Sequence, residues 1–285
     1  MIVFTDLDGC LLEEQTYDHT PAIPTLERLR HDGIPLVLCT SKTIAEVETL
    51  AARLDHAGPW IVENGGAIVL PHGHALSVAN GGLRGSTTVV TLGAPAADLT
   101  RTLARLAHDV GIVVEGLSTM TNERVAELTG LDLVSAARAR ARQYSEPFLT
   151  DATPSQLAVL ERAAAAAGAR VTKGGRFFHF TGDTDKGVAV RWLLERDAAA
   201  RDGRVTSLGL GDAPNDLPLL LAVDRPVVIP RPNGLPHPGL AAALPDAECA
   251  PRPGPVGWSA AVTVVLDGGR LPPVRSAQAG SRSRS

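Results

Sequence analysis

The chain has 285 residues, of which 44% are hydrophobic and 20% charged, and its formal net charge is -4. This length and composition allow one large domain, or a core with a second domain inserted into it. Lys and Arg form no basic stripe, so we expect no nucleic acid as a partner. No apolar stretch is long enough to span a bilayer, so we expect no membrane partner either.

The cysteines and the first residues favour a reducing compartment. Cys10, Cys39 and Cys249 form no CxxC pair, and their odd number argues against a disulfide framework. Met1 is followed at once by a strand-like run, so we expect no signal peptide. A cytoplasmic protein fits these features best. The sequence does not reveal the oligomeric state.

The first chemical signature is a pair of acids after the opening apolar run. Residues 2–5 predict a buried strand, and Asp6, Asp8 and Gly9 lie just beyond it. Two carboxylates two residues apart lie on the same side of the chain, and Gly9 permits the tight turn that follows. Such a pair suits a hard cation such as Mg²⁺. Taken alone, the stretch is equally typical of a surface turn that caps a helix.

Strand and helix patterns then alternate. We expect a helix over 21–32, a strand over 34–39, a helix over 43–54 and a strand over 60–62. This alternation predicts an α/β fold, a doubly wound parallel sheet with a Rossmann-like core. Polar residues follow two of these strands, namely Thr40, Ser41 and Lys42 after one and Glu63 and Asn64 after the other.

The middle of the chain departs from this alternation. Residues 71–85 are rich in Gly, His and Asn and predict a linker. The patterns beyond it indicate strands over 87–92, 113–114, 146–149 and 177–180, and helices over 96–109 and 154–167. We interpret residues 83–182 as an inserted α+β cap domain, between core segments 1–82 and 183–270.

The core pattern returns near the end. We expect a helix over 187–196, a strand over 206–210, a helix over 217–222, a strand over 226–229 and a last helix from 257. Asp212, Asn215 and Asp216 follow the first of these strands, and Lys186 stands before the first helix. Residues 271–285 are interpreted as a disordered tail, because the segment 276–285 has nothing to bury.

Polar groups therefore follow four predicted strands, and parallel strands bring their carboxyl ends to one edge of a sheet. Each group has a plainer interpretation: Thr40 as a helix cap, the stretch around Asp212 as a turn, Lys186 as a solvated charge. Their occurrence together, in this order, favours an active site.

The motifs DLDG, a Thr–Ser pair after the second strand, a Lys before the last motif and GDxxND resemble the haloacid dehalogenase-type phosphatase superfamily. The inserted domain is similar to the α/β cap of its Cof-like subgroup, the C2B type. The stretches VFTDLDGCLL, CTSKT, IVENGG, RQYSEPF and GDAPNDLPLL most resemble the mannosyl-3-phosphoglycerate phosphatase family, over residues 2 to about 232. One departure is Cys10, where that family usually has Thr.

The resemblance implies a Mg²⁺-dependent phosphoric monoester hydrolase that works through an aspartyl-phosphate. Asp6 would be the nucleophile and Asp8 the general acid and base. The metal would be held by Asp6, Asp8, Asp212 and Asp216. The implied phosphate-binding residues are Thr40, Ser41, Lys186 and Asn215.

The implied substrate is a small phosphorylated sugar-glycerate, mannosyl-3-phosphoglycerate or its glucosyl counterpart. Its carboxylate calls for an arginine in the cap, with Arg142 as first choice and Arg140 and Arg176 as alternatives, although a solvated helix face explains each equally well. Lys42, Asn64 and Gly65 are candidates for contact with the sugar or the glycerate. Three alternatives stay open: a broader sugar-phosphate phosphatase, a phosphomannomutase-like phosphotransferase, and a non-catalytic binding protein.

Overall fold

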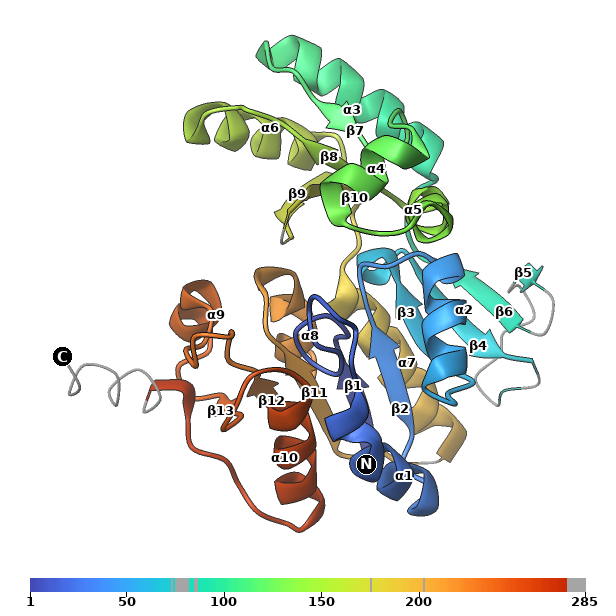
Figure 1. The fold of residues 1–285 in the computed structure, drawn as a ribbon, viewed down its shortest axis with the longest axis vertical. Coiled ribbons are helices and arrows are strands. Elements are labelled where there is room, and N and C mark those ends of the chain that lie inside the picture. The colour runs from blue at the N-terminus through green and yellow to red at the C-terminus, as the bar shows by residue number, and fades with distance from the viewer. Residues whose placement is uncertain (73, 75–81, 85–86, 175, 202, 276–285) are drawn as a thin grey trace. The chain divides into compact units, whose positions relative to one another are not determined.

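The computed structural model describes residues 1–72, 74, 82–84, 87–174, 176–201 and 203–275 (Figure 1). The chain divides into two compact units, the first made of residues 1–40 and 186–285 and the second of residues 41–185. Of the tail expected to be disordered over 271–285, residues 276–285 lie outside the described residues, as does most of the expected linker. Within 271–275, Val274 is fully buried and its N–H donates to the carbonyl of Ala247 at 2.9 Å. No helix in the described part of the chain combines the length and the apolarity that crossing a membrane requires.

The first unit contains a parallel sheet in which β1 (Ile2–Thr5) lies between two other strands. Its strand order is β13 (Glu248–Cys249), β12 (Arg225–Val228), β11 (Ser207–Gly211), β1 and β2 (Leu36–Cys39). Thr5 of β1 stands opposite Leu210 on one side and Leu38 on the other. All four residues of β1 are buried, as a strand covered on both faces requires.

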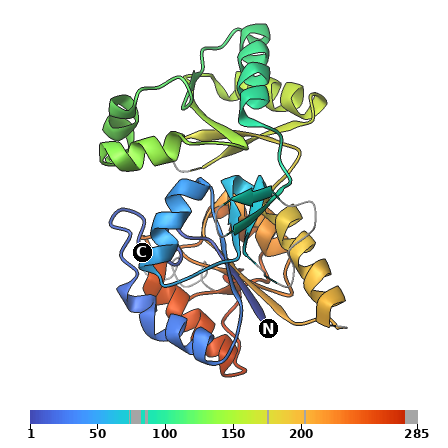
Figure 2. The ribbon, with the colours of Figure 1, turned by 90° about the vertical axis from the view of Figure 1, so that its right-hand side faces the viewer.

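Helices cover both faces of this sheet. They are η1 (Thr20–Ala22), α1 (Ile23–His31), α7 (Lys186–Arg201), η3 (Pro214–Asp216), α8 (Leu217–Leu221), α9 (Pro238–Ala243) and α10 (Gly254–Leu266). Helix α1 contacts α10 and helix α7 contacts α8. Figure 2 shows α1 and α10 on one side of the sheet and α7 on the other. The predicted α/β class with a doubly wound parallel sheet is thus confirmed.

The second unit begins with α2 (Ile44–Arg53) and an antiparallel set of strands. The strand order is β3 (Trp60–Val62), β4 (Ala67–Pro71), β6 (Thr87–Thr91) and β5 (Gly82–Arg84), with η2 (Glu63–Gly65) between β3 and β4. Thr43 caps α2 in a reciprocal pair with Glu46. Strand β6 pairs with β4 on one side and with β5 on the other. The division of the chain at 82 and 182 stays a prediction.

The rest of the second unit is a four-stranded antiparallel sheet with four helices. Its order is β7 (Glu115–Gly116), β8 (Ser145–Leu149), β10 (Phe178–Gly182) and β9 (Ala169–Lys173). The helices are α3 (Ala96–Val110), α4 (Asn122–Thr129), α5 (Leu133–Arg140) and α6 (Pro154–Ala166). Phe148 and Phe180 pack with apolar residues of α3 and α6 to form the core. Helices α4 and α5 enclose a smaller core around Val125 and Ala136.

The expected helices and strands are confirmed with small shifts at their ends, except for one. The strand expected over 113–114 is wrong: β7 lies at Glu115–Gly116. Val113 is 76% exposed, so its β-branched side chain has no core to enter. Strands β4, β5, β9 and β13 and helices α4, α5 and α9 were not predicted; most of them are short, and β5 lies within the expected linker.

Candidate active site

The carboxyl ends of three neighbouring strands of the first unit carry predicted site residues. Asp6 follows β1, Thr40 follows β2 and Asp212 follows β11. The backbone N–H of Asp6 donates to the carbonyl of Leu210 at 3.0 Å, which continues the parallel pairing beyond the strand. The predicted convergence of these chain segments therefore exists in the first unit.

A buried ion cluster lies at this edge, centred on Lys186. This side chain is fully buried at the first residue of α7. Its ammonium Nζ donates to Oδ1 of Asp6 and to Oδ1 of Asp216, each at 2.6 Å. The next residue is Gly187, whose missing Cβ would lie 2.3 Å from the carbonyl oxygen of Pro218. Glycine therefore lets α7 approach α8 closely enough for the ammonium to reach both acids.

Asp216 uses its other oxygen to fix the loop after β11. Oδ2 accepts hydrogen bonds from the backbone N–H groups of Asp212 and Ala213, both at 3.1 Å. A Cβ at Gly211 would lie 2.4 Å from Cβ of Asp216, so this close approach also needs glycine. Because both oxygens of Asp216 are engaged, this carboxylate holds Lys186 and the loop. Its part in metal binding stays a prediction.

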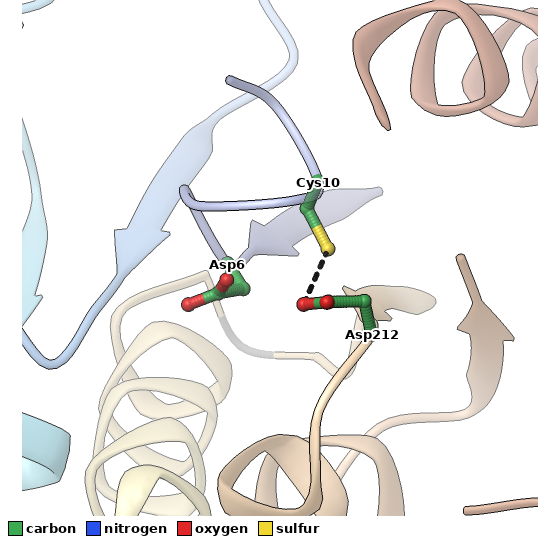
Figure 3. A group of neighbouring side chains, drawn as sticks. All are labelled: Asp6, Cys10 and Asp212. Carbon is green, nitrogen blue, oxygen red and sulfur yellow. Dashed lines mark hydrogen bonds between the residues drawn. The ribbon is translucent and has the colours of Figure 1, made fainter. Parts of the chain in front are cut away.

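The turn after Asp6 brings Cys10 beside Asp212. Gly9 has a φ of +76°, and a Cβ there would lie 2.7 Å from Oδ2 of Asp212. The turn is closed by the N–H of Leu12, which donates to the carbonyl of Leu7 at 2.8 Å. Cys10 is fully buried, and its Sγ donates to Oδ1 of Asp212 at 3.6 Å (Figure 3). The thiol therefore restrains one oxygen of this acid.

A second support for Asp6 was missed by sequence reasoning. The indole N–H of Trp258 in α10 donates to Oγ1 of Thr5 at 2.8 Å. Thr5 in turn donates to the carbonyl of Asp6 at 2.8 Å. Trp258 and Thr5 are both fully buried. No local pattern could reveal this pair, because 253 positions separate the two residues.

The electrostatics of the cluster reflect an excess of acids. Burial and the nearby Asp216 raise the pKa of Asp6 from 3.8 to about 7, although Lys186 opposes the shift. Burial, with Asp216 and Asp6, raises the pKa of Asp212 well above its ordinary value. Burial alone would lower the pKa of Lys186, but Asp216 and Asp6 outweigh it and raise that pKa, so the ammonium stays charged. Three acids thus share one buried cation.

The donor set fits a divalent cation. Asp6, Cys10 and Asp212 each offer a ligand atom, and these atoms all lie within 4.8 Å of one another. The carboxylate oxygens of Asp6 and Asp212 are the hard ligands that Mg²⁺ takes, and a cation would offset the excess negative charge. Asp8, the remaining predicted ligand, is half-buried in the turn after β1.

The predicted phosphate-binding residues are divided between the units. Thr40 is fully buried at the end of β2, and Asn215 is half-buried in η3, close in sequence to Asp212 and Asp216. Lys186 lies in the ion cluster. Ser41 belongs to the second unit. The phosphate-binding roles of all four stay predictions.

In the second unit, Glu63 organises the stretch 143–145. Its fully buried carboxylate accepts hydrogen bonds from the backbone N–H groups of Gln143 at 2.9 Å and Tyr144 at 3.0 Å, and from Oγ of Ser145 at 2.7 Å. Gly66 lies against Tyr144, since a Cβ there would be 2.3 Å from that of the tyrosine. The motifs IVENGG and RQYSEPF are therefore in direct contact within this unit.

The predicted substrate-binding residues of the second unit fall into two groups. The first surrounds Glu63: Asn64 is buried with a φ of +57°, Gly65 is buried, and Lys42 is 8% exposed. The second group consists of the three arginines, and these are placed differently from one another.

Arg142 donates through Nη1 to the carbonyl of Ser41 at 2.6 Å and to Oγ of Ser145 at 3.2 Å. Arg140 donates to Oδ1 of Asn122 at 2.7 Å, whereas Arg176 is exposed beyond β9. The roles of all three in substrate binding stay predictions.

Comparison with known proteins gives a consistent set of relatives. Residues 3–80 match the model of the haloacid dehalogenase-like hydrolases. The chain is 38% identical over 262 residues to the glucosyl-3-phosphoglycerate/mannosyl-3-phosphoglycerate phosphatase of Methanococcoides burtonii, covering 92% of this chain and 95% of the relative. It is 36% identical to the mannosyl-3-phosphoglycerate phosphatase of Pyrococcus furiosus, covering 78% and 88%.

Among solved structures, a HAD subclass IIB sugar phosphatase superposes with a TM-score of 0.61. The alignment covers 94% of this chain and 98% of the other at 14% identity, so it bears on the fold alone.

Proposed function

We propose a function from one premise: this chain belongs to the haloacid dehalogenase-like hydrolases and, within them, to the family of glucosyl-3-phosphoglycerate/mannosyl-3-phosphoglycerate phosphatases. The predicted resemblance is thereby confirmed. The chain is a phosphatase that hydrolyses mannosyl-3-phosphoglycerate or its glucosyl counterpart to the sugar glycerate and inorganic phosphate. The observation that carries this proposal is the identity of 38% to such an enzyme across nearly the whole of both chains.

The ion cluster supports a covalent route. Asp6 attacks the phosphorus atom, an aspartyl-phosphate bond forms, and the bond from phosphorus to the glycerate oxygen breaks. Asp8 donates its proton to the leaving oxygen. A water molecule then attacks the phosphorus and gives a proton to Asp8, which releases phosphate and restores Asp6. Lys186, charged and 2.6 Å from Asp6, favours the ionised form of the nucleophile and opposes the negative charge of the phosphoryl group.

Asp6 and Asp212 would hold Mg²⁺, with Asp8 and Asp216 as the further predicted ligands. When bound, this ion supplies positive charge that lessens the repulsion between the nucleophile and the phosphate. Thr40 and Asn215 complete the proposed phosphate-binding set with Lys186 and Ser41. A cytoplasmic location, with a small phosphorylated molecule as the only partner, is part of the same proposal.

Substrate choice is the part of the proposal that an assay decides. Phosphate release with Mg²⁺ is measured from mannosyl-3-phosphoglycerate, glucosyl-3-phosphoglycerate, mannose 6-phosphate and 3-phosphoglycerate. We expect kcat/KM to favour the first two by about a hundredfold or more, roughly 3 kcal/mol of transition-state binding. A flat profile would leave the phosphatase chemistry standing and reject the sugar-glycerate substrate. Transfer of phosphate to a second sugar instead of water would favour the phosphotransferase.

Arg142 is the proposed reader of the glycerate carboxylate. Replacing it with alanine should raise KM for the phosphoglycerate ester by roughly ten- to a hundredfold and leave KM for an aryl phosphate nearly unchanged. Arg105→Ala is the matched control, because this arginine is an exposed partner of Asp109 on α3. An equal rise in KM for both substrates would show that Arg142 does not bind the carboxylate and serves only to hold Ser41 and Ser145 in place.

A further inference from the structure

Cys10 gives the cation site a ligand of a different chemical kind. Its Sγ lies 3.6 Å from Oδ1 of Asp212, and the thiol is fully buried. Figure 3 shows the sulfur directed toward Asp212, and a carboxylate oxygen of Asp6 lies within 4.8 Å of the ligand atoms of both residues. A threonine here, as the sequence resemblance would lead one to expect, would offer a hydroxyl oxygen. The change from oxygen to sulfur therefore occurs at a cation site.

The geometry suits an ion that binds sulfur and oxygen together. In tetrahedral sites zinc lies about 2.3 Å from a cysteine sulfur and about 2.1 Å from a carboxylate oxygen, which puts the two ligand atoms about 3.6 Å apart. The separation between Sγ of Cys10 and Oδ1 of Asp212 is 3.6 Å. The ligand atom of Asp6 completes a three-point set within 4.8 Å. Cys10 and Asp212 are thus already spaced for a single ion, and Asp6 is near enough to join them by a side-chain adjustment.

Ligand softness decides which ion gains from this arrangement. Mg²⁺ takes hard oxygen ligands and gains nothing from sulfur. Thiophilic ions such as Zn²⁺ and Cd²⁺ bind a thiolate strongly and also accept carboxylate oxygens. Both kinds of ion need Asp6 and Asp212, so they compete for one site.

We propose that Asp6, Cys10 and Asp212 form a site for a thiophilic divalent cation, and that such an ion displaces the hard cation and inhibits the enzyme. The sulfur–metal bond forms as the thiol proton leaves to solvent. The ion also binds the carboxylate of Asp6 and so withdraws the proposed nucleophile. The binding itself needs only these three side chains, whereas the inhibition rests on the proposed function.

Cadmium binding to the full-length, metal-stripped protein tests the site without any substrate. Cd²⁺ is titrated in while the charge-transfer absorption of a cadmium–thiolate bond is recorded. We expect this absorption to saturate near one equivalent, and the Cys10→Ser and Cys10→Thr variants to lack it and to bind Cd²⁺ at least about tenfold more weakly. Their Mg²⁺ affinity should change little. Two variants are used so that a folding defect in one leaves the test intact.

Cys249→Ser is the matched control. Cys249 is also buried, but it lies in β13 and its Sγ donates to the carbonyl of Ala250 at 3.5 Å. This variant should keep the full cadmium absorption. An unchanged absorption in both Cys10 variants, or none in the natural protein, would overturn the proposed site.

A second arm measures hydrolysis of an aryl phosphate with Mg²⁺ and increasing Cd²⁺. We expect inhibition that excess Mg²⁺ and a chelator reverse, and that weakens at least about tenfold in Cys10→Thr. Inhibition of equal strength in the variant would reject the role of Cys10. If the protein hydrolyses no phosphate ester at all, the proposed function fails, and the cadmium absorption still decides the binding site.

Discussion

Each of the two units buries a charged side chain at the centre of a polar network. The two networks differ in whether the partners of that side chain are charged or neutral. In the first unit, Lys186 faces two carboxylates at 2.6 Å, and a third acid, Asp212, stands close by. In the second unit, the donors described for the carboxylate of Glu63 are neutral, namely two backbone N–H groups and one hydroxyl. Both residues are fully buried.

We interpret this difference as one between the proposed reactive cluster and a structural network. Burial, and then the crowding of three acids around one ammonium, raises the pKa values of Asp6 and Asp212. Such a cluster gains from a cation. Three neutral donors hold both carboxylate oxygens of Glu63, as a buried carboxylate that fixes a loop requires. Polar residues after a strand therefore belong to the proposed reaction site in the first unit, whereas in the second unit Glu63 holds a neighbouring chain segment in place.

The largest expected effect comes from Asp6→Asn. This change keeps the shape of the side chain and removes the nucleophilic charge. We expect kcat to fall by at least roughly 10⁴ while the melting temperature stays close to that of the natural protein. Initial rates and a thermal melt are the two measurements. Appreciable turnover in this variant would reject the covalent mechanism.

Lys186→Met tests the balance of charge in the same cluster. It leaves Asp6 and Asp216 buried without their shared cation, and loss of one partner of a buried ion pair costs about 3–5 kcal/mol. We expect that loss of unfolding free energy in urea, together with loss of activity. Adding Asp216→Asn should restore part of the stability but no activity. An unchanged unfolding free energy in Lys186→Met would contradict the account of the cluster.

Glu63→Gln should have a smaller effect, which lowers the stability of the protein and leaves its activity unchanged. The NH₂ group of the glutamine would replace a carboxylate oxygen that accepts a hydrogen bond from a backbone N–H. That N–H then loses its partner, which lowers the unfolding free energy by about 1–3 kcal/mol. Hydrolysis of an aryl phosphate should keep its kcat. Exposed Glu161 supplies the control, since Glu161→Gln should alter neither quantity. A large fall in kcat with normal stability would show that Glu63 takes part in the reaction, which contradicts its structural role.

The smallest expected effect is a pH dependence of the metal-free protein. The folded state holds a proton on Asp6, because burial raises its pKa from 3.8 to about 7. The stability that this proton confers is fully present below pH 3.8 and is lost as the pH rises through about 7. Between about pH 5.5 and 7.5 the melting temperature of the chelator-treated protein should therefore fall as the pH rises. Added Mg²⁺ should raise this melting temperature by more at the higher pH. A melting temperature that rises over this pH range would contradict the raised pKa of Asp6.

Much of the first unit could be predicted because its signals are local. The run 2–5 reads as a strand from its own residues, and Asp6, Asp212 and Asp216 follow strands whose parallel order brings them to one edge. Gly9 also predicted a tight turn, and its φ of +76° confirms this prediction. Local pattern and tertiary structure agree in these places.

The remainder depends on residues far apart in the chain. The contact from Cys10 to Asp212 spans 202 positions, and the contact from Trp258 to Thr5 spans 253, so neither leaves a periodic signal. The second unit was harder for the same reason. Glu63 was visible as a polar residue after a strand, but its partners at 143–145 lie on another segment, and only the fold brings them within 3.0 Å.

The central claim is that Asp6 carries the phosphoryl group during turnover. The direct measurement is rapid acid quenching of the enzyme with mannosyl-3-phosphoglycerate and Mg²⁺, followed by mass spectrometry of the peptide that contains residues 1–27. We predict one added phosphoryl group on Asp6, formed faster than steady-state phosphate release and absent from Asp6→Asn. A phosphoryl group on another residue, or turnover with no phosphoenzyme at any quench time, would contradict the account.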